Sequence, residues 1–401
     1  MKESHIDWCP VIPDHWEEKR IKDIAFLQSG NSITAMDFVE DGKYPVYGGN
    51  GLRGYTNTYT NEGDYVLIGR QGALCGNINY AHGKFYASEH AVVVYPKKEE
   101  ITLWLGETLR TANLNRLSMT AAQPGLAVST LNLQFIPFPP KDERIRIAKY
   151  LDKKLSEIDH QVSILTSKRD AYLRLKKSII NHVVTHGLNP NVKMKDSGIE
   201  WIGEVPEHWE VKRMKDIFFE RKELSLTGEE DLLSVSEFYG VARRKDKMNS
   251  DEEFESRADS LVGYKICKAH DLVINIMLAW KTGLGISDND GIVSPAYAVY
   301  EGRNIASHFY HYLLRSGMYV KEFKRHSKGI IDSRLRLYND RFNNISAIYP
   351  PLPEQRSIAT YLDDKCAKID TIVSNLDKQI SRYGDLKRSL IDEVITGKRA
   401  V

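Results

Sequence analysis

The feature that most constrains the fold of this chain is a long internal repeat. Residues 6–24, with a central His-Trp-Glu, return 193 residues later as residues 199–217. Residues 139–152, with Pro-Pro and Ile-Ala-x-Tyr-Leu-Asp, return 211 residues later as residues 350–363. A repeat of this length predicts two copies of one structural plan. Two copies in one chain indicate a pseudo-symmetric molecule, whose substrate or partner is itself two-fold or bipartite.

The edges of the two copies match closely, whereas their middles match poorly. Between the repeated edges the second copy is 18 residues longer than the first. A fixed frame with a variable interior is typical of proteins that carry different recognition surfaces on one scaffold.

The composition is that of an ordinary soluble globular protein. A chain of 401 residues predicts two to four domains, and 42% hydrophobic with 27% charged residues is an average balance. No apolar run approaches the length of a transmembrane helix, and the chain does not start like a secretory signal. The four cysteines form no Cys-x-x-Cys pair, which fits a reducing compartment. We expect a cytoplasmic protein that does not contact membranes.

The net charge of +2 gives only weak support for nucleic-acid binding, so local clustering matters more. Residues 141–186 hold 11 Lys/Arg against 6 Asp/Glu, and residues 321–341 hold 7 against 3. Residues 243–247 form a third basic group. Residues 17–140 are balanced, at 11 basic and 12 acidic. If the first variable segment binds DNA, its basic residues must lie on one face.

Two stretches show the heptad spacing of a coiled coil. Between residues 143 and 185, and again after residue 351, apolar residues alternate at intervals of four and three. The first seam holds Leu151, Leu155, Ile158, Val162 and Leu165, and the second holds Leu362, Cys366, Ile369, Val373 and Leu376. Each stretch predicts a helix ~60 Å long.

Each apolar seam is too narrow to pack on a globular core and too long to stand alone. Because both helices end a repeat, we expect them to pair with each other in antiparallel fashion, with a variable domain at each end. The alternative is two unrelated amphipathic helices that pack on their own domains. Their matched length and phase favour the pair.

The two variable middles read as mixed α/β. Residues 63–69 and 91–95 in the first, and residues 271–276 and 297–300 in the second, are β-branched and aromatic runs bounded by Gly, Asn and Asp. A helical stretch follows in each copy, at residues 102–114 and 307–324. Trp16 and Trp209 are expected to pack the variable domains onto the helices.

These residues resemble a known family. The features that carry the resemblance are the His-Trp repeat, the Pro-Pro…Glu…Ile-Ala-x-Tyr-Leu-Asp helix starts, and the run of residues 187–190 into residues 195–203. Together they are similar to the specificity subunit of type I DNA restriction–modification systems, over essentially the whole chain.

The resemblance implies two pseudo-symmetric α/β target-recognition domains joined by two long antiparallel coiled-coil helices. The expected divisions are residues 1–140 for the first recognition domain and 141–188 for the first spacer helix. Residues 189–350 would form the linker and the second recognition domain, and residues 351–401 the second spacer helix.

The resemblance also implies sequence-specific binding of double-stranded DNA with a bipartite target. It implies assembly with two adenine methyltransferase subunits and two restriction (endonuclease–translocase) subunits. S-adenosylmethionine, ATP and Mg would then be used by those partners, with no cofactor or metal in this chain. The sequence itself has no Asn-Pro-Pro-aromatic motif and no phosphate-binding loop. We therefore expect a non-catalytic subunit. The alternative functions are an antiparallel coiled-coil adaptor that binds protein and, less favoured, a stand-alone nuclease.

Three motifs mimic catalytic or cofactor sites. Residues 49–54 match the dinucleotide fingerprint, but the strand-like residues 55–60 follow where a helix is needed, so a turn is expected. Asp14 and Glu17 are too close in sequence to converge on a metal from separate strands. His308 and His311 have no evident third ligand, which favours surface histidines.

Candidate DNA-reading residues follow from residue type and loop position. Arg and Lys suit guanine, and Asn and Gln suit adenine. The candidates are Asn50, Arg70 and Gln71 in the first domain, and Arg243, Arg244, Lys281, Arg334 and Arg336 in the second. The alternative for each is a phosphate contact or a solvated surface side chain.

Overall fold

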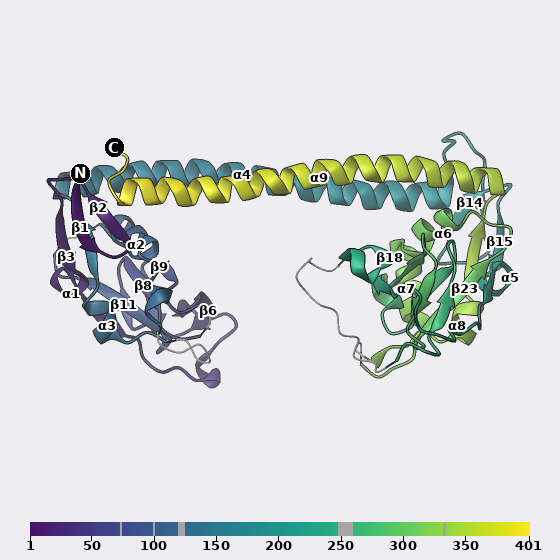
Figure 1. The fold of residues 1–401 in the computed structure, drawn as a ribbon, viewed down its shortest axis with the longest axis horizontal. Helices are drawn as coiled ribbons and strands as arrows, with labels where there is room; N and C mark the ends of the chain where they lie inside the picture. Colours follow the sequence, from purple (N-terminus) through teal and green to yellow (C-terminus); the bar gives the residue numbers. More distant parts are fainter. Residues whose placement is uncertain (73, 99–100, 119–124, 248–259, 332–333) are drawn as a thin grey trace. The chain divides into compact units, whose positions relative to one another are not determined.

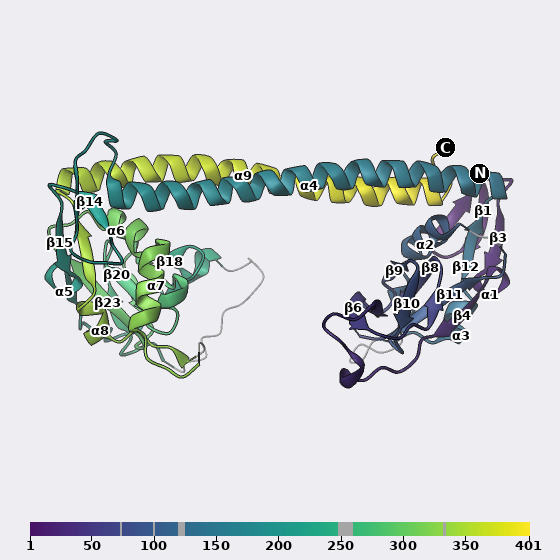
Figure 2. The same ribbon diagram turned by 180° about the vertical axis from the view of Figure 1, so that it is seen from behind.

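The computed structural model divides the chain into two compact units. It describes residues 1–401 except 73, 99–100, 119–124, 248–259 and 332–333. Unit 1 comprises Met1–Thr166 and Asp377–Val401, and unit 2 comprises Ser167–Leu376. Both ends of the chain therefore belong to unit 1 (Figure 2). No helix in the described part of the chain is both long and apolar enough to cross a membrane.

Unit 1 is built on a four-stranded antiparallel sheet in the order β4-β11-β8-β9. The strands are β4 (Ala25–Ser29), β8 (Tyr65–Gly69), β9 (Ile78–Ala81) and β11 (Ala91–Pro96). Side chains alternate between the two faces of a strand. Val66 and Ile68 therefore face a core shared with helix α2 (Thr102–Thr111), whereas Leu67 faces the opposite side.

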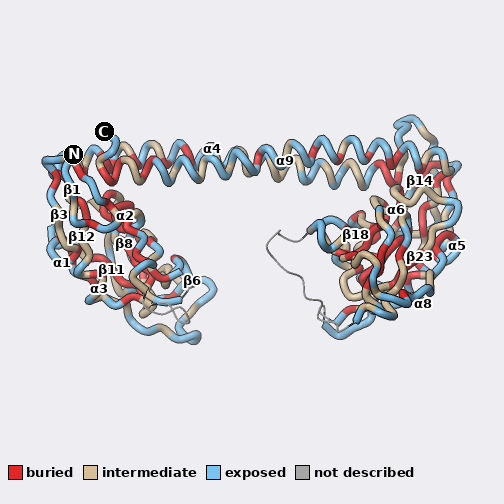
Figure 3. Tube along the Cα trace, in the orientation of Figure 1, coloured by how far each residue is buried: buried red, intermediate tan, exposed pale blue. Residues whose placement is uncertain are grey.

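The opposite face of that sheet packs on a second, smaller sheet in the order β6-β5-β10-β7. These strands are β5 (Tyr44–Gly48), β6 (Gly51–Thr56), β7 (Asn61–Glu62) and β10 (Lys84–Ala87). Phe85 and Ala87 of β10 meet Leu67 and Val93 there. The central sheet is thus buried on both faces (Figure 3).

Unit 2 repeats this plan with a different sequence. Its four-stranded sheet has the order β16-β23-β20-β21, from β16 (Phe218–Glu220), β20 (Leu272–Asn275), β21 (Leu284–Ile286) and β23 (Tyr297–Gly302). In both units the first strand along the chain is an edge strand, the last strand lies next to it, and the two middle strands follow. The two middles, which match poorly in sequence, therefore share one strand order.

The remaining elements of unit 2 are short. Hairpin β17 (Leu233–Ser236)–β18 (Gly240–Arg243) and the pair β19 (Lys265–Cys267)–β22 (Gly291–Val293) flank the sheet. The helical stretch predicted for residues 307–324 is two helices, α6 (Ser307–Leu314) and α7 (Gly317–His326). The chain turns between them because Ser316 is buried in an extended conformation.

The repeated edges of the sequence form the base of each unit. In unit 1, β3 (Glu17–Arg20) pairs with β12 (Phe135–Phe138), and in unit 2, β15 (Glu210–Arg213) pairs with β24 (Ser346–Tyr349). Each ribbon joins the start of a variable segment to its end. A variable interior can therefore differ in length without disturbing the frame.

Two long helices complete the units. They are α4 (Lys141–His186, 46 residues) and α9 (Leu352–Ile395, 44 residues), and they pack together (Figure 1). In unit 1 the start of α4 buries Leu151 and Ile158 against Leu390 and Val394 near the end of α9. In unit 2 the end of α4 lies against the start of α9. The segments are antiparallel in both units, which confirms the predicted fold class.

Two ion pairs across the helices are equivalent under the repeat. Lys387 Nζ lies 2.7 Å from Asp159 Oδ1 in unit 1, and Lys176 Nζ lies 2.6 Å from Asp370 Oδ1 in unit 2. Both lysines occupy seam slots where the heptad pattern lacks an apolar residue. An aspartate of the opposite helix neutralises each lysine, so the two helices stay in contact at these heptad positions.

The His-Trp motif anchors each variable domain on the helices, as predicted. Trp16 and Trp209 are fully buried. His15 Nε2 lies 2.9 Å from Glu143 Oε2, and His208 Nε2 lies 2.8 Å from Glu354 Oε1. The Trp209 indole also donates to Glu354, whereas Trp16 Nε1 has no hydrogen-bond partner among the described residues.

Each tryptophan packs beneath a glycine that follows the end of a long helix. Gly187 follows α4 at φ +77°, and a Cβ built on it would lie 3.2 Å from Trp209 Cζ2. Gly397 follows α9 at φ +74°, and its Cβ would lie 2.5 Å from Pro13 Cδ and 3.1 Å from Trp16 Cη2. The positive φ and the close approach both require glycine.

Replacement of Gly397 should destabilise unit 1 more than backbone strain alone explains. Gly83→Ala is the matched control, because Gly83 has φ +66° in the same unit and open space around its Cβ position. We expect Gly83→Ala to lower the free energy of unfolding by about 1–2 kcal/mol, for the left-handed backbone. Gly397→Ala should lose a further ~1–3 kcal/mol from overpacking against Pro13 and Trp16.

Urea unfolding of the full chain, followed by tryptophan fluorescence, would measure both changes. Equal losses in the two variants would show that the contact with Trp16 contributes nothing to stability.

Candidate nucleic-acid interface

The three residues predicted to read DNA in unit 1 lie in one loop cluster. Asn50 Oδ1 accepts a hydrogen bond from Asn77 Nδ2 at 3.2 Å. Gln71 Oε1 lies 3.0 Å from His90 Nδ1, and the Arg70 N–H donates to the His90 carbonyl at 2.9 Å. We call residues 48–51, 69–72, 76–77 and 88–90 the first loop cluster. Asn50 and Gln71 are exposed on it.

Glycines let these loops approach closely. A Cβ on Gly69 would lie 2.3 Å from the Gly49 carbonyl oxygen, and one on Gly49 would lie 3.2 Å from the Gln71 carbonyl oxygen. The glycine run at residues 48–54 therefore serves backbone packing at the β5–β6 turn. Strand β6 follows it, in place of the helix that a dinucleotide site requires.

The five predicted residues of unit 2 come from three segments that meet. The segments are residues 236–247, residues 276–284, and residues 324–331 with 334–337, which we call the second loop cluster. Arg243 ends β18 and Arg244 begins the following turn, Lys281 lies in the second segment, and Arg334 and Arg336 lie in the third. The Leu337 N–H donates to the Ile276 carbonyl at 2.8 Å, which joins the last two segments.

Several of these cations already have partners. Arg243 Nε lies 3.4 Å from Asp231 Oδ2, and Lys245 Nζ lies 2.7 Å from Asp231 Oδ1. The hydrogen bond from Lys245 lowers the pKa of Asp231, so this carboxylate stays charged. Lys281 Nζ lies 4.9 Å from the centre of the Trp280 ring, and Lys324 Nζ lies 5.0 Å from it. Arg244 and Arg334 are exposed.

Arg315 was not among the predicted site residues, yet it holds the second loop cluster together. Its guanidinium donates to four backbone carbonyls. Nη1 bonds Thr282 O and Leu284 O, both at 2.6 Å, and Nη2 bonds Glu237 O at 2.9 Å and Phe238 O at 3.1 Å. Burial lowers the pKa of Arg315 from its ordinary value, but an arginine keeps its charge. Its one signal in the sequence is that, like Arg110 in the first copy, it directly follows a leucine within the predicted helical stretch.

His311 lies beside Arg315 and is structural. Its Nδ1 accepts the Ile286 N–H at 3.3 Å, and its Cε1 would lie 3.0 Å from a Cβ on Gly240. Burial lowers the pKa of His311 to about 3, so the ring is neutral at physiological pH.

The suspected metal sites do not form. His308 Nε2 lies 3.3 Å from Asp288 while His311 is engaged elsewhere, so the pair does not converge. Asp14 pairs with the amino terminus and Glu17 pairs with Lys19. The described residues contain no group of three or more His, Cys, Asp or Glu side chains that could hold a metal ion.

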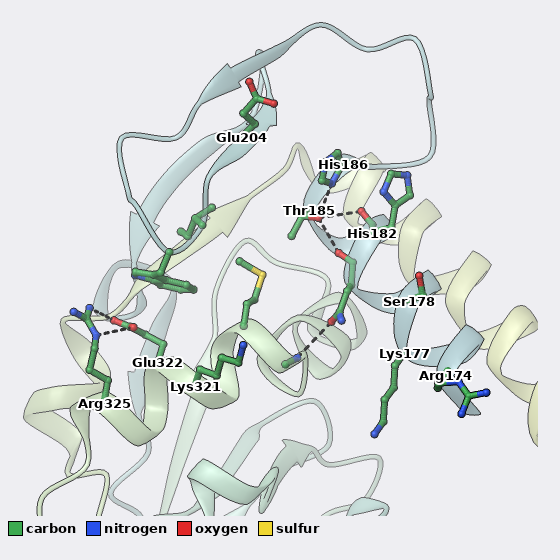
Figure 4. A pocket seen from close by; sticks show the side chains of 15 residues that line it. Arg174, Lys177, Ser178, His182, Thr185, His186, Glu204, Lys321, Glu322 and Arg325 are labelled. Carbon is green, nitrogen blue, oxygen red and sulfur yellow. Dashed lines mark hydrogen bonds and ion pairs between the residues drawn. The ribbon is translucent and has the colours of Figure 1, made fainter. Parts of the chain in front are cut away.

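A basic cleft of about 1010 Å³ lies in unit 2, where the end of α4 faces α7 (Figure 4). Arg174 and Lys177 of α4 and Lys321 and Arg325 of α7 line it. Arg325 Nε donates to buried Glu322 at 2.9 Å, which fixes the guanidinium on the helix. Four cations on the rim of an open cleft suit phosphate groups better than a small-molecule reaction.

In unit 1, helix α2, which packs on edge strand β9 as α6 packs on β21, faces α4 and α9 with a more balanced set of charges. Glu107 is buried, accepts a hydrogen bond from the Tyr80 hydroxyl at 2.7 Å, and lies 3.1 Å from Arg110 Nε. The surrounding cavity of about 720 Å³ also holds Asp152 and Asp159. The two clefts thus differ in charge and in the helices that line them, α4 and α7 in unit 2 and α2, α4 and α9 in unit 1.

Comparison with known proteins identifies the family. The family model described as "Type I restriction modification DNA specificity domain" matches residues 13–165 and 206–382. The chain is 40% identical over 141 residues to the EcoprrI specificity subunit of Escherichia coli, a match that spans 34% of this chain and 35% of that protein. It is 22% identical to the MjaVIII specificity subunit of Methanocaldococcus jannaschii, over 96% of this chain and 93% of that protein.

Solved structures agree with the fold. One, titled for complex assembly and conformational transition of the type I R-M system, has a TM-score of 0.69 at 14% identity, over 97% of this chain and 100% of that one. The HsdS subunit of Thermoanaerobacter tengcongensis has a TM-score of 0.50 at 14% identity, over the full length of both chains.

The two matching segments each hold a His-Trp anchor and a loop cluster, and together they cover most of the chain. The chain belongs to the type I restriction–modification DNA-specificity family.

Proposed function

We propose that this chain reads a bipartite double-stranded DNA target, with one loop cluster on each half, and scaffolds the subunits that modify and cleave the DNA. Specificity subunits of its family are non-catalytic. The partners proposed are two methyltransferase subunits and two restriction–translocase subunits. These partners would use S-adenosylmethionine, ATP and Mg, in the cytoplasm.

The observation that carries this proposal is one sheet topology repeated beneath two different loop clusters. The sheets β4-β11-β8-β9 and β16-β23-β20-β21 have the same strand order. The side chains above them differ, with amides in the first cluster and mainly cations in the second. Two readers on one frame fit a target whose halves differ in sequence, because amides suit adenine and cations suit guanine or phosphate.

The helices support the scaffolding role and the number of partners. Leu175 on α4 is 47% exposed, and its repeat equivalent Leu386 on α9 is 51% exposed. Tyr150 and Tyr361 form a second equivalent pair near the helix starts, and Tyr361 is also exposed. Matched surfaces in the two copies favour two identical partner subunits, one for each copy.

The alternative is a protein-binding adaptor without DNA specificity. A pool of random-sequence DNA duplexes, selected by the purified full chain together with its methyltransferase partner, separates the two. We expect the selected duplexes to share two short motifs at a fixed separation. Recovery of no enriched sequence, despite an assembled complex, would favour the adaptor.

Independent reading of the two halves predicts the result of a domain exchange. Replacing residues 210–350 by the corresponding segment of another family member should change one half of the selected target and preserve the other. The ribbon β15–β24 marks both joints of the exchange, so the frame stays intact. A change in both halves would contradict independent reading.

Gln71 provides a test at the level of a single residue. If Gln71 reads an adenine edge, Gln71→Ala should reduce discrimination at one base pair of the first half by ~1–3 kcal/mol. Gln28→Ala is the matched control, because Gln28 is exposed on β4 and is not part of the first loop cluster. Binding competition with single-base variants of the target would measure the change. If Gln71→Ala discriminates as well as the wild type does, Gln71 does not read a base.

A further inference from the structure

Phe238 is the most exposed phenylalanine among the described residues, and it lies at the tip of a hairpin. Its relative exposure is 91%, whereas Phe218, Phe309, Phe323 and Phe342 in the same unit are fully buried. It occupies the turn between β17 and β18, with Glu237 before it and Tyr239 after it. A ring so fully exposed to water, in a unit that buries four other phenylalanines completely and leaves Phe219 only partly exposed, calls for a partner.

The backbone that carries this ring is firmly held. Arg315 Nη2 donates to the carbonyls of Glu237 and Phe238, at 2.9 and 3.1 Å. Thr282 Oγ1 donates to the Glu237 carbonyl at 2.7 Å, and the Phe238 N–H donates to Ser236 Oγ at 3.1 Å. These bonds come from the neighbouring loop and from α6 as well as from the hairpin itself. The ring is therefore presented on a preorganised turn, which reduces the entropy lost on binding.

The surroundings of the tip are cationic. Arg243 ends β18, and the exposed residues Arg244 and Lys245 follow it. Lys281 follows Trp280 on the loop that Arg315 ties to the hairpin. Lys281 Nζ and Lys324 Nζ both lie over the Trp280 ring. Among the described residues, the carboxylates nearby include Glu237, Asp246 and Asp231, the last of which pairs with Arg243 and Lys245.

A flat apolar ring surrounded by cations matches one kind of partner. That partner is a polyanion whose interior contains flat apolar groups. Nucleic acids have phosphates outside and stacked bases inside, and apolar side chains inserted between base steps are a recurrent means of opening a duplex. A hydrophobic pocket on a protein partner would match the ring but not the surrounding cations.

We propose that Phe238 inserts into the DNA of the second half-site and stacks on a base at an unstacked step of the duplex. This inference rests on the proposed function, since it names how the second loop cluster engages DNA. Arg315 is then a positioning residue, which fixes the depth and direction of the ring through the carbonyls of Glu237 and Phe238. A methyltransferase must take its target base out of the stack, and an inserted ring lowers the free energy of that opening.

The test uses the full chain in complex with its methyltransferase partner and a duplex carrying the selected target. The duplex has 2-aminopurine, which brightens when it loses its stacking neighbours, at successive positions of the second half. With the wild type we expect brightening at one step. Phe238→Ala should abolish it and weaken binding about 10-fold, as loss of one base–aromatic stack does. Phe238→Trp should keep both.

The matched control is Phe219→Ala. Phe219 is also partly exposed, but it lies on β16 at the opposite edge of the sheet from β21, next to which β18 lies. With Phe219→Ala, the fluorescence pattern of the duplex and the affinity for DNA should equal those of the wild type. Phe238 makes its contacts through its backbone, so Phe238→Ala should melt at the wild-type temperature.

The outcomes separate the inference from the proposed function. If the wild type binds no sequence specifically, the proposed function itself fails. If the wild type binds its target but Phe238→Ala keeps both affinity and brightening, insertion is overturned. Insertion is also overturned if Phe238→Ala weakens assembly with the methyltransferase in the absence of DNA, because the ring would then fit a protein pocket.

Discussion

The structure depends on the pairing of two apolar seams that neither helix can bury alone. Helices α4 and α9 each present a stripe too narrow for a globular core, and each stripe is covered by the other helix. Where the stripe is interrupted by a lysine, the opposite helix supplies an aspartate. Such exposed ion pairs contribute roughly 0–1 kcal/mol each, so they adjust a register that apolar burial and the anchored domains already fix.

The sequence alone predicts the frame because the frame is made of local and repeated signals. Heptads, Pro-Pro helix starts and the His-Trp anchors recur at fixed offsets, and the helices and their partners follow from them. The strand order of the sheets could not be predicted, since β4 and β16 pair with strands that arrive some 60 or more residues later. Periodicity identifies a strand but does not say which strand it joins.

The loops show the same limit at the level of single residues. Gln71, Arg70 and Asn50 were chosen by residue type, and the fold gathers them into one cluster through contacts with His90 and Asn77. Arg243 was chosen by the same rule, but Asp231 across the hairpin occupies part of its guanidinium. Arg315 was missed because its role depends on hydrogen bonds to four backbone carbonyls, and residue types do not indicate where backbone carbonyls will lie. Phe238 stands out only once four other phenylalanines of unit 2 are known to be buried.

The division of the chain into units also bears on the order in which the protein is made. Unit 2 is one continuous segment, whereas unit 1 joins Met1–Thr166 to Asp377–Val401. During synthesis Leu151, Leu155 and Ile158 emerge long before Leu390 and Val394, which cover them. The amino-terminal unit is therefore completed last, although domains generally fold as they leave the ribosome. Until then its half of the seam is an uncovered apolar stripe on the nascent chain, which a chaperone or a second nascent chain can occupy.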